Sequence, residues 1–413
     1  MMLNLFCIRP KGFNIGNEVI YQGMLAFVRR AFGGRANVIS LPATSRYESC
    51  AKAGLTPRTV HEINQYGHGV IVGGGNLFEN GELEMDPGAV EALDVPLMLF
   101  SLGAGRIYDR RHRLTRRTDA MPPDRIRALC RQARVVMVRD HCTADLVRRS
   151  GCPRVITAGC PSLHLADGSV WLPESPGTPP ALLSIRAPEL MNIPLADQAR
   201  VRGDVRRIVG VIQDAGFGDV KLLCHDHRDL PFAASLGDVP YLYTDDVFVY
   251  LGWLRSCRVQ VGYRLHAALP CLAMGTPTVS ISYDERARSL LETVGVGDWD
   301  INMMRTPDVA RCVADRLHRL EDLARIGRER AGMWAVLGGR MTAGFATFAR
   351  AVRDTAAATG AIDDAPPDLA PGGDTGTSTG HVAAGDVGGD GGAVRRSVRA
   401  ARRAVALSRG DLS

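Results

Sequence analysis

Short apolar, β-branched runs alternate with longer amphipathic stretches along most of this chain. In the first part, strand-like runs cover residues 3–8, 37–41, 69–72, 96–102, 135–138 and 155–157. Apolar residues at helical spacing cover 18–32, 124–133 and 143–149 between them. Strands that alternate with helices of this length are typical of βα units around a mostly parallel sheet. The pattern predicts one doubly wound α/β domain over residues 1–172.

A proline-rich stretch then interrupts the alternation. Pro173, Pro176, Pro179 and Pro180 surround Gly177, and prolines fit poorly into a helix or a strand ladder. We therefore place an interdomain linker there. Strand-like runs resume at residues 182–185, 220–224, 241–243, 259–261 and 278–282, with helical runs at 196–215 and 247–255. A second α/β domain over residues 181–358 follows, and two such domains imply a cleft.

The last part of the chain has a different composition. Thr306 and Pro307 have the chemistry of a helix cap and first turn, so a further helix should start there. From residue 359 onward Gly, Asp, Thr and Pro dominate, which predicts a disordered tail over 359–413. This tail ends in a basic segment with Arg395, Arg396, Arg399, Arg402, Arg403 and Arg409. The segment is either a weak contact with an anionic membrane surface or a solvated tail.

Composition narrows the classes of function. The 413 residues are 46% hydrophobic and 23% charged, which fits a globular chain of two domains. Only Lys11, Lys52 and Lys221 are lysines, and most arginines alternate with acids, so the net charge of +6 does not indicate a nucleic-acid partner. Ten scattered cysteines without a C-x-x-C pair indicate a reducing compartment. Without a signal peptide or an apolar run near ~20 residues, we expect a cytoplasmic protein, peripheral at the inner membrane face if the tail binds lipid.

Glycine-rich and polar loops follow several of the predicted strands, where open α/β sheets bind ligands. Asn14, Gly16 and Asn17 precede the helix expected from Glu18, whose N-terminus would offer free N–H groups. Gly73 to Gly75 and Asn76 follow the strand at 69–72. Three consecutive glycines indicate positive φ or close approach of a ligand, with tight packing of strand against helix as the alternative. We take Gly74, Gly75 and Asn76 as candidate substrate contacts.

Similar loops continue along both predicted sheets. A second glycine-rich loop, with Gly103 and Arg106, follows residues 96–102. Arg139 and Asp140 follow the strand at 135–138. Asp140 has the chemistry of a helix-start acid. In the second domain the candidates are Arg186, His225, Tyr283 and Asp284. His225 and His227 form a His-x-His pair, but no third ligand stands at motif spacing, so we predict a polar rim without a metal.

The most informative motif is Tyr263-Arg264-Leu265-His266, directly after the strand at 259–261. In extended geometry residues i and i+2 point the same way. A guanidinium fork beside an imidazole suits a phosphorylated or carboxylated substrate. The alternative is that Arg264 pairs with a structural carboxylate and His266 caps the next helix.

Together these motifs resemble the polysaccharide pyruvyl transferase family over about residues 1–300. The similarity rests on residues 14–18, 73–76, 101–103, Arg139-Asp140 with Thr143, and 263–266 through Gly275-Thr276-Pro277 to Tyr283-Asp284. The resemblance implies a GT-B-like fold, two Rossmann-type domains that face a cleft. It implies transfer of an enolpyruvyl-derived unit from phosphoenolpyruvate to sugar hydroxyls, giving a pyruvate ketal and phosphate without a further cofactor.

The resemblance also implies roles for individual residues. Arg264 would match the donor-binding arginine of the family, with His266 beside the phosphate or acting as a general acid. Arg106, Arg139 and Arg186 are further donor-binding candidates by their positions in the chain.

Two departures and two rival functions accompany this interpretation. Family members usually have Asp where this chain has Asn17, and residues 158–162 lack the usual acid. The first rival is a GT-B glycosyltransferase with a nucleotide-sugar donor, in which Asp284 or Glu285 would contact the ribose. The second is a non-catalytic binding protein of the same fold.

Overall fold

The computed structural model describes residues 2–12, 14–46, 52–165, 171–174, 177–358 and 360. All elements below belong to one compact unit, Met1–Asp364. The basic C-terminal segment and Pro176 of the expected linker lie outside the described residues. No helix among the described residues is long and apolar enough to cross a membrane.

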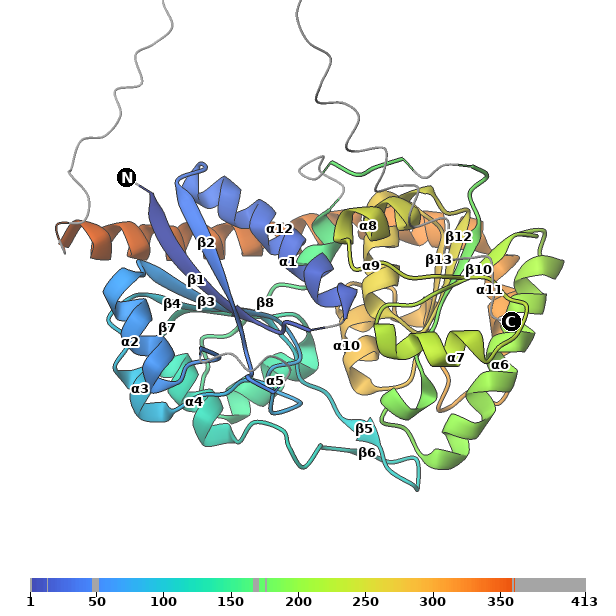
Figure 1. The fold of residues 1–413 in the computed structure, drawn as a ribbon, viewed down its shortest axis with the longest axis horizontal. Coiled ribbons are helices and arrows are strands. Elements are labelled where there is room, and N and C mark those ends of the chain that lie inside the picture. Colours follow the sequence, from blue (N-terminus) through green and yellow to red (C-terminus); the bar gives the residue numbers. More distant parts are fainter. Residues whose placement is uncertain are drawn as a thin grey trace, which may run out of the picture. The chain divides into compact units, whose positions relative to one another are not determined.

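The first lobe is built on a six-stranded parallel sheet with the order β2-β1-β3-β4-β7-β8 (Figure 1). Its strands are β1 (Leu3–Arg9), β2 (Ala36–Pro42), β3 (Gly69–Gly75), β4 (Leu97–Leu102), β7 (Ala133–Val138) and β8 (Ile156–Thr157). Its helices are α1 (Ile15–Phe32), α2 (Pro57–Tyr66), α3 (Pro87–Glu91), α4 (Pro123–Gln132) and α5 (His141–Arg149), followed by the 3₁₀ turn η1 (Pro161–His164). Apolar residues of α2 to α5 cover one face of the sheet, and α1 covers the other.

The second lobe repeats this arrangement with the order β11-β10-β9-β12-β13-β14. Its strands are β9 (Ala181–Ser184), β10 (Val220–Leu223), β11 (Tyr241–Leu242), β12 (Val259–Gly262), β13 (Thr278–Ser282) and β14 (Ile301–Asn302). Its helices are α6 (Leu195–Asp214), α7 (Leu230–Ala234), α8 (Val247–Ser256), α9 (Leu265–Met274), α10 (Glu285–Thr293) and α11 (Val309–Leu317), with 3₁₀ turns η2 (Pro188–Leu190), η3 (His227–Asp229) and η4 (Gly297–Trp299). Helices α6, α7 and α11 pack on one face, and α8 and α9 on the other. Two parallel α/β sheets confirm the predicted fold class.

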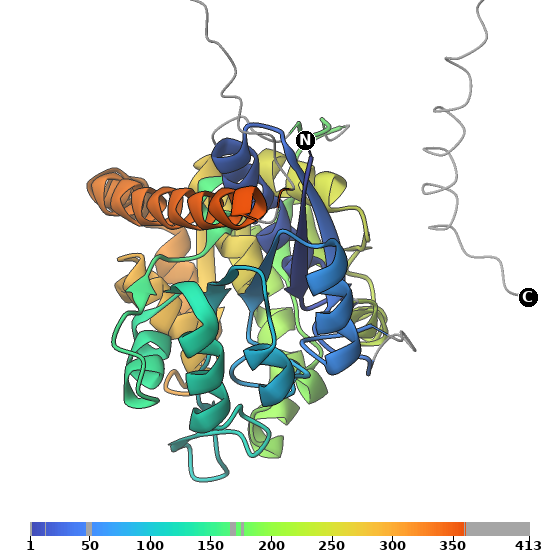
Figure 2. The same ribbon diagram turned by 90° about the vertical axis from the view of Figure 1, so that its left-hand side faces the viewer.

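A long helix joins the two lobes. Helix α12 (Leu320–Ala358) begins beside the second lobe and runs to the first, where it lies alongside α1 (Figures 1 and 2). Met341, Phe345 and Phe348 are fully buried against the first sheet. The sequence pattern assigned all residues up to 358 to the second domain, but the latter half of α12 completes the core of the first lobe.

A small hairpin makes a second connection. Strands β5 (Ile107–Tyr108) and β6 (Leu114–Thr115) pair antiparallel and extend from the first lobe. Tyr108 is buried in the core of the second lobe, and its hydroxyl accepts from Asn302 Nδ2 at 3.1 Å. Beside it, His112 Nε2 lies 2.8 Å from Asp197 Oδ2. The hairpin therefore fixes one lobe against the other.

Two helices begin at other residues than the sequence pattern predicted, because of their capping side chains. Asn14 caps α1 by accepting from Gly16 N at 3.0 Å, so the helix begins at Ile15, before Glu18. Asp308 caps α11 by accepting from Arg311 N at 3.1 Å, so the prediction of Thr306 as cap and Pro307 in the first turn was wrong.

Candidate active site

A cavity of about 390 Å³ lies where the carboxyl ends of both sheets meet. Its wall comes from the loops after β1, β3 and β7 in the first lobe and after β9, β10, β12 and β13 in the second. Parallel strands end at the same edge of a sheet, so residues distant in sequence converge here. Most of the predicted site residues line this cavity, namely Asn14, Asn17, Gly75, Asn76, Arg139, Arg186, His225, Arg264, His266, Tyr283 and Asp284.

Arg264 is the residue that immediately precedes α9, in extended backbone geometry. Its side chain is 8% exposed; Nε donates to Ile185 O at 2.9 Å and Nη2 donates to Asp229 Oδ2. The structural carboxylate weighed as the alternative partner therefore exists, yet Arg264 also lines the cavity. Because a guanidinium carries five N–H groups, these two contacts leave donors for a ligand while fixing the orientation of the fork.

Two further arginines pair with Asp226 or with Asp229, the carboxylate that holds Arg264. Arg186 Nη1 lies 3.5 Å from Asp226 Oδ2 and 3.8 Å from Asp229 Oδ1. Arg228 Nη2 lies 2.5 Å from Asp226 Oδ2. Asp226 and Asp229 are both fully buried. Three guanidiniums and two carboxylates leave an excess of positive charge on this wall of the cavity.

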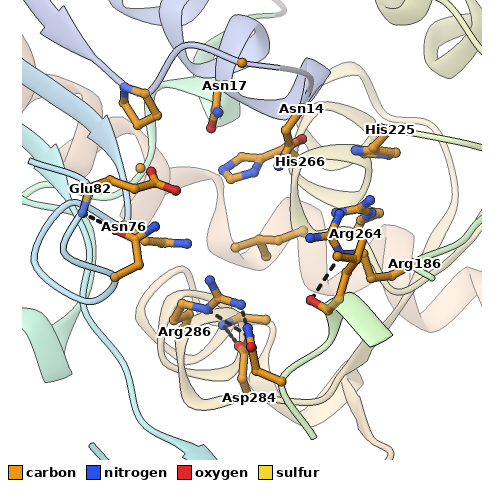
Figure 3. A pocket seen from close by; sticks show the side chains of 18 of the residues that line it. Asn14, Asn17, Asn76, Glu82, Arg186, His225, Arg264, His266, Asp284 and Arg286 are labelled. Atoms are coloured by element: carbon orange, nitrogen blue, oxygen red, sulfur yellow. Dashed lines mark hydrogen bonds and ion pairs between the residues drawn. The ribbon is translucent and has the colours of Figure 1, made fainter. Parts of the chain in front are cut away.

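His266 lies in the first turn of α9, not in the extended geometry that the sequence argument assumed. Both His266 and Arg264 still line the cavity, Arg264 as the N-cap of α9 and His266 as its second residue. Figure 3 shows the imidazole of His266 between Asn14 and the cavity. Its Nε2 atom is buried and has no hydrogen-bond partner among the described residues. A ligand in the cavity is the natural partner for that nitrogen.

The pKa of His266 is lowered by its burial and by nearby positive charges. Burial, together with the guanidiniums of Arg139, Arg286 and Arg264, lowers the pKa to about 3. Burial and then Arg264 also hold the pKa of His225 well below its usual range. Both imidazoles are therefore neutral at physiological pH, in a region of positive potential. Such a region favours a bound anion.

Arg139 enters the cavity from the first lobe and is 2% exposed. Its Nη2 donates to Asn76 Oδ1 at 2.5 Å, and its Nε lies 3.4 Å from Asp140 Oδ2. Asp140 caps α5, accepting from Thr143 N at 2.8 Å, and also accepts from Ser289 Oγ at 3.0 Å. Asp140 is thus the helix-start acid that the sequence suggested, and it also links the lobes.

The expectation of free N–H groups at the start of α1 was wrong. Ile15 N donates to His225 O at 2.9 Å, Gly16 N to Asn14 Oδ1 at 3.0 Å, and Asn17 N to Asn14 O at 3.0 Å. These amides are occupied by protein acceptors. The start of α1 supplies side chains to the cavity, those of Asn14 and Asn17, rather than an anion-binding helix end.

Gly16, Gly74 and Gly103 do not line the cavity, although they were predicted to contact substrate. A Cβ on Gly74, where φ is +75°, would lie 2.7 Å from Ile20 Cγ2, so tight packing of strand against helix explains this glycine. A Cβ on Gly16 would lie 3.1 Å from His266 Cβ. A Cβ on Gly103 would lie 2.3 Å from Arg139 Nε. Gly16 and Gly103 leave room for the two site side chains rather than for the substrate.

Arg106 was also predicted to bind substrate, but the structure places it outside the central cavity. It forms an ion pair with Glu285, with Nε 3.0 Å from both carboxylate oxygens, and its side chain is 52% exposed. Because Glu285 starts α10, this pair joins the two lobes. Arg106 and Glu285 both line a separate hollow.

Arg286 and Glu82 are cavity residues that the sequence argument did not select. Arg286 pairs with Asp284 and lies 3.3 Å from Glu79 Oε2. Burial by itself would lower the pKa of Arg286, but Asp284 and Glu79 outweigh it and raise the pKa. Burial raises the pKa of Glu79 to about 7. Arg286 lies in the first turn of α10, only two residues beyond the recognised Asp284, so its proximity in sequence was the available signal.

His225 and His227 do not form a metal site in the described part of the chain. The Tyr250 hydroxyl lies 2.7 Å from His225 Nε2, and His227 is largely exposed beside Asp226. No group of three His, Cys, Asp or Glu side chains suited to a metal ion occurs among the described residues. The pair instead borders the cavity through His225.

The sequence profile of the polysaccharide pyruvyl transferase family matches residues 14–285. The match covers well over half of the chain and extends from the cap of α1 to the start of α10. The chain belongs to this family. It is therefore a transferase with a glycan acceptor in the general sense of the family. Among curated proteins no sequence matches this member.

Solved structures with a similar fold share little sequence with this family member. The MnaA–UDP structure of S. aureus has a TM-score of 0.50 and 11% identity, covering 89% of this chain and 100% of that one. A protein assigned as a UDP-N-acetylglucosamine 2-epimerase of Listeria monocytogenes has a TM-score of 0.50 and 11% identity, with coverages of 80% and 91%. At such identity the likeness shows the GT-B-like fold alone.

Proposed function

We propose that this transferase moves an enolpyruvyl-derived unit from phosphoenolpyruvate to two hydroxyls of a sugar or glycoside. The product is a pyruvate ketal, and inorganic phosphate is released. Phosphoenolpyruvate is the only co-substrate in this proposal, and no metal is included.

The observation that carries the proposal is the positive potential at the buried imidazole of His266. Arg139, Arg286 and Arg264 all act on it in the same direction, although each has a carboxylate nearby. Phosphoenolpyruvate carries a phosphate and a carboxylate, and guanidinium forks bind both groups in a bidentate manner. A cavity of about 390 Å³ has room for this donor and for the reacting part of a sugar.

The reaction requires several proton transfers, and a neutral imidazole can take part in them. C3 of the donor gains one proton and becomes a methyl group, which makes C2 electrophilic. One acceptor hydroxyl bonds to C2, the bond from C2 to the phosphate oxygen breaks, and the second hydroxyl closes the ketal. Of the two hydroxyl protons, one balances the proton gained by C3 and the other balances the proton on phosphate. We assign to His266 a proton transfer at the phosphate group, because its Nε2 lacks a protein partner.

The first rival function is that of a glycosyltransferase with a nucleotide-sugar donor. It would require a free acidic side chain to contact the ribose, and the two candidates have protein partners. Asp284 accepts from Ala287 N at 3.0 Å and is paired with Arg286. Glu285 is held by Arg106 outside the central cavity. Both candidates for that role are thus engaged within the protein.

The test combines ligand binding with a phosphate-release assay. Purified protein is titrated with phosphoenolpyruvate and with UDP-sugars by calorimetry. Phosphate release is then measured with a panel of methyl hexopyranosides, with and without EDTA. Binding of phosphoenolpyruvate together with acceptor-dependent phosphate release supports pyruvyl transfer. Binding of UDP-sugars alone supports the glycosyltransferase, and binding of phosphoenolpyruvate without turnover of any acceptor supports the non-catalytic rival.

A further inference from the structure

Four carboxylates line the central cavity; two of them form ion pairs and a third is exposed to solvent. Asp119 pairs with Arg117 at 2.7 Å. Asp284 pairs with Arg286 and caps α10. Glu189 is exposed on the 3₁₀ turn after β9. The fourth is Glu82.

Glu82 differs from the other three in its surroundings. It is half-buried, and no Lys, Arg or His side chain of the described residues lies within ion-pair distance of it. Asn80, two residues earlier, accepts from Glu82 N at 3.3 Å. Burial raises the pKa of Glu82, while Asn80, Arg286, Arg117 and Arg46 act in the opposite direction. A carboxylate in this setting is a better proton acceptor than an exposed, ion-paired one.

The position of Glu82 separates it from the donor-binding arginines of the second lobe. Glu82 comes from the loop after β3 of the first lobe, whereas Arg186 and Arg264 come from the second lobe; Arg139, after β7, is the donor-side arginine of the first lobe. Figure 3 shows the carboxylate of Glu82 pointing into the cavity below Asn17, with Arg264 and Arg186 on the opposite side and His266 between the two sides. A carboxylate repels a phosphate or a donor carboxylate, so its natural neighbour is an uncharged hydroxyl. The amide of Asn17 on the same wall cannot take a proton at neutral pH.

We propose that Glu82 is the catalytic residue that accepts the proton from the attacking hydroxyl of the acceptor. This inference rests on the proposed function. The O–H bond of the acceptor breaks and its proton moves to Glu82 Oε. The electron pair of that bond forms the new bond to C2 of the donor, whose C3 has gained a proton from water. The bond from C2 to the phosphate oxygen then breaks with its electron pair going to phosphate, and the second hydroxyl bonds to C2 and loses its proton, which balances the proton on phosphate. Glu82 returns its proton to water before the next turnover, and this proton replaces the one taken up by C3.

The wall that carries Glu82 also indicates the class of acceptor. Asn17, Asn76 and Asn80 line the cavity from the first lobe, as Glu82 does, and Figure 3 shows Asn17 and Asn76 on the same side of the cavity as Glu82. Amide groups donate to and accept from hydroxyls without adding charge. The part of the acceptor that faces these amides and Glu82 is therefore a hydroxyl-bearing, uncharged part of a sugar.

The test compares Glu82→Gln with a matched control in the same loop. Glu84 stands two residues further on, lies outside the cavity, and accepts from Ser45 N at 2.7 Å and Thr44 Oγ1 at 2.8 Å. For each variant, the dissociation constant for phosphoenolpyruvate and the rate of phosphate release with methyl hexopyranosides are measured. Glu82→Gln should bind phosphoenolpyruvate as tightly as the unaltered protein or more tightly, and should lose about 10²-fold or more in kcat. Glu84→Gln should retain both.

A pH profile adds a readout that a structural role would not change. In the unaltered protein kcat/KM should fall on the acid side as Glu82 is protonated, and Glu82→Gln should lack this limb. Glu82→Asp keeps a carboxylate and should retain more activity than Glu82→Gln, which gives a result even if the amide variant folds poorly.

The outcomes separate this proposal from the proposed function. If the unaltered protein releases phosphate and Glu82→Gln does so within about threefold of its rate with the same pH limb, Glu82 is not the base. Loss of phosphoenolpyruvate binding in folded Glu82→Gln would also overturn the assignment, because it would place Glu82 on the donor side. If the unaltered protein neither binds phosphoenolpyruvate nor releases phosphate, pyruvyl transfer itself is wrong.

Discussion

Gly103 lies directly against the guanidinium of Arg139. A Cβ atom on Gly103 would lie 2.3 Å from Nε and 2.4 Å from Cζ of that arginine. Gly103 follows β4 and Arg139 follows β7, and these strands are neighbours in the first sheet. A residue without a side chain at the end of one strand thus sets where the arginine of the next strand can lie.

Gly103→Ala should therefore weaken donor binding without direct contact with the donor. The methyl group would displace the Arg139 fork from Asn76, and a charge-assisted hydrogen bond is worth about 1.5–3 kcal/mol, so we expect a loss of roughly tenfold or more in affinity for phosphoenolpyruvate. Calorimetric titration measures the effect. Gly203→Ala is the control, because that glycine lies in α6 with open space around it. An unchanged dissociation constant in Gly103→Ala would show that Arg139 does not hold the donor.

The sequence located the sheets well because their signal is local. Every strand expected from β-branched and apolar runs exists, and each runs parallel to its neighbours. The hairpin of β5 and β6 and the return of α12 to the first lobe were not predicted. Both depend on partners distant in the chain: Tyr108 packs in the second lobe and Phe345 under the first sheet. The local periodicity of the sequence does not indicate contacts between residues so far apart in the chain.

The site shows the same division between local and distant information. The position of Arg264 and His266 after a buried strand was sufficient to place both at the cavity. The sequence offered tight packing as the alternative for Gly74 but could not identify Ile20 on α1 as its neighbour, and it did not indicate that Gly103 lies against Arg139. Glu82 was missed because its loop has no motif, and only the folded cavity distinguishes it from Glu84.

Arg264→Lys should impair both binding and stability. The arginine reaches Ile185 O and Asp229 with different nitrogens, and a single ammonium cannot reproduce that fork. Asp229 is fully buried, so imperfect pairing should cost about 1–3 kcal/mol of unfolding free energy. Urea denaturation and phosphate release measure the two effects. A lysine variant with native stability and rate would contradict the role of the fork.

His266→Ala should abolish phosphate release while the protein stays folded. The imidazole Nε2 has no protein partner, so its removal breaks no hydrogen bond made by that atom. Circular dichroism and thermal unfolding check the fold, and a coupled phosphate assay checks the rate. A rate equal to that of the unaltered protein would remove His266 from the mechanism.

Arg106→Ala should have little effect on the affinity for phosphoenolpyruvate. Its partner Glu285 lies outside the central cavity, and the arginine is half exposed. Exposed ion pairs contribute about 0–1 kcal/mol to stability, so the melting temperature should also change little. Measuring both against Arg139→Ala, which should lose donor affinity, separates the two arginines. A comparable loss in Arg106→Ala would return it to the donor site.

The unliganded protein should lose stability as the pH falls from 6.5 toward 3, partly because of His266. Its pKa is lowered to about 3 in the folded state by burial and by Arg139, Arg286 and Arg264, and an unfolded histidine titrates near 6.5. Between these values the unfolded chain binds the extra proton, so protonation favours unfolding by up to about 1.4 kcal/mol per pH unit. The glutamine side chain of His266→Gln cannot titrate in this range. The unfolding free energy of His266→Gln should therefore fall less steeply with decreasing pH, by up to about 1.4 kcal/mol per pH unit, the contribution of one proton. Urea denaturation at several pH values gives both slopes. Equal slopes would mean that the imidazole is not held neutral by its neighbours, and the positive potential at the cavity would lose its main support.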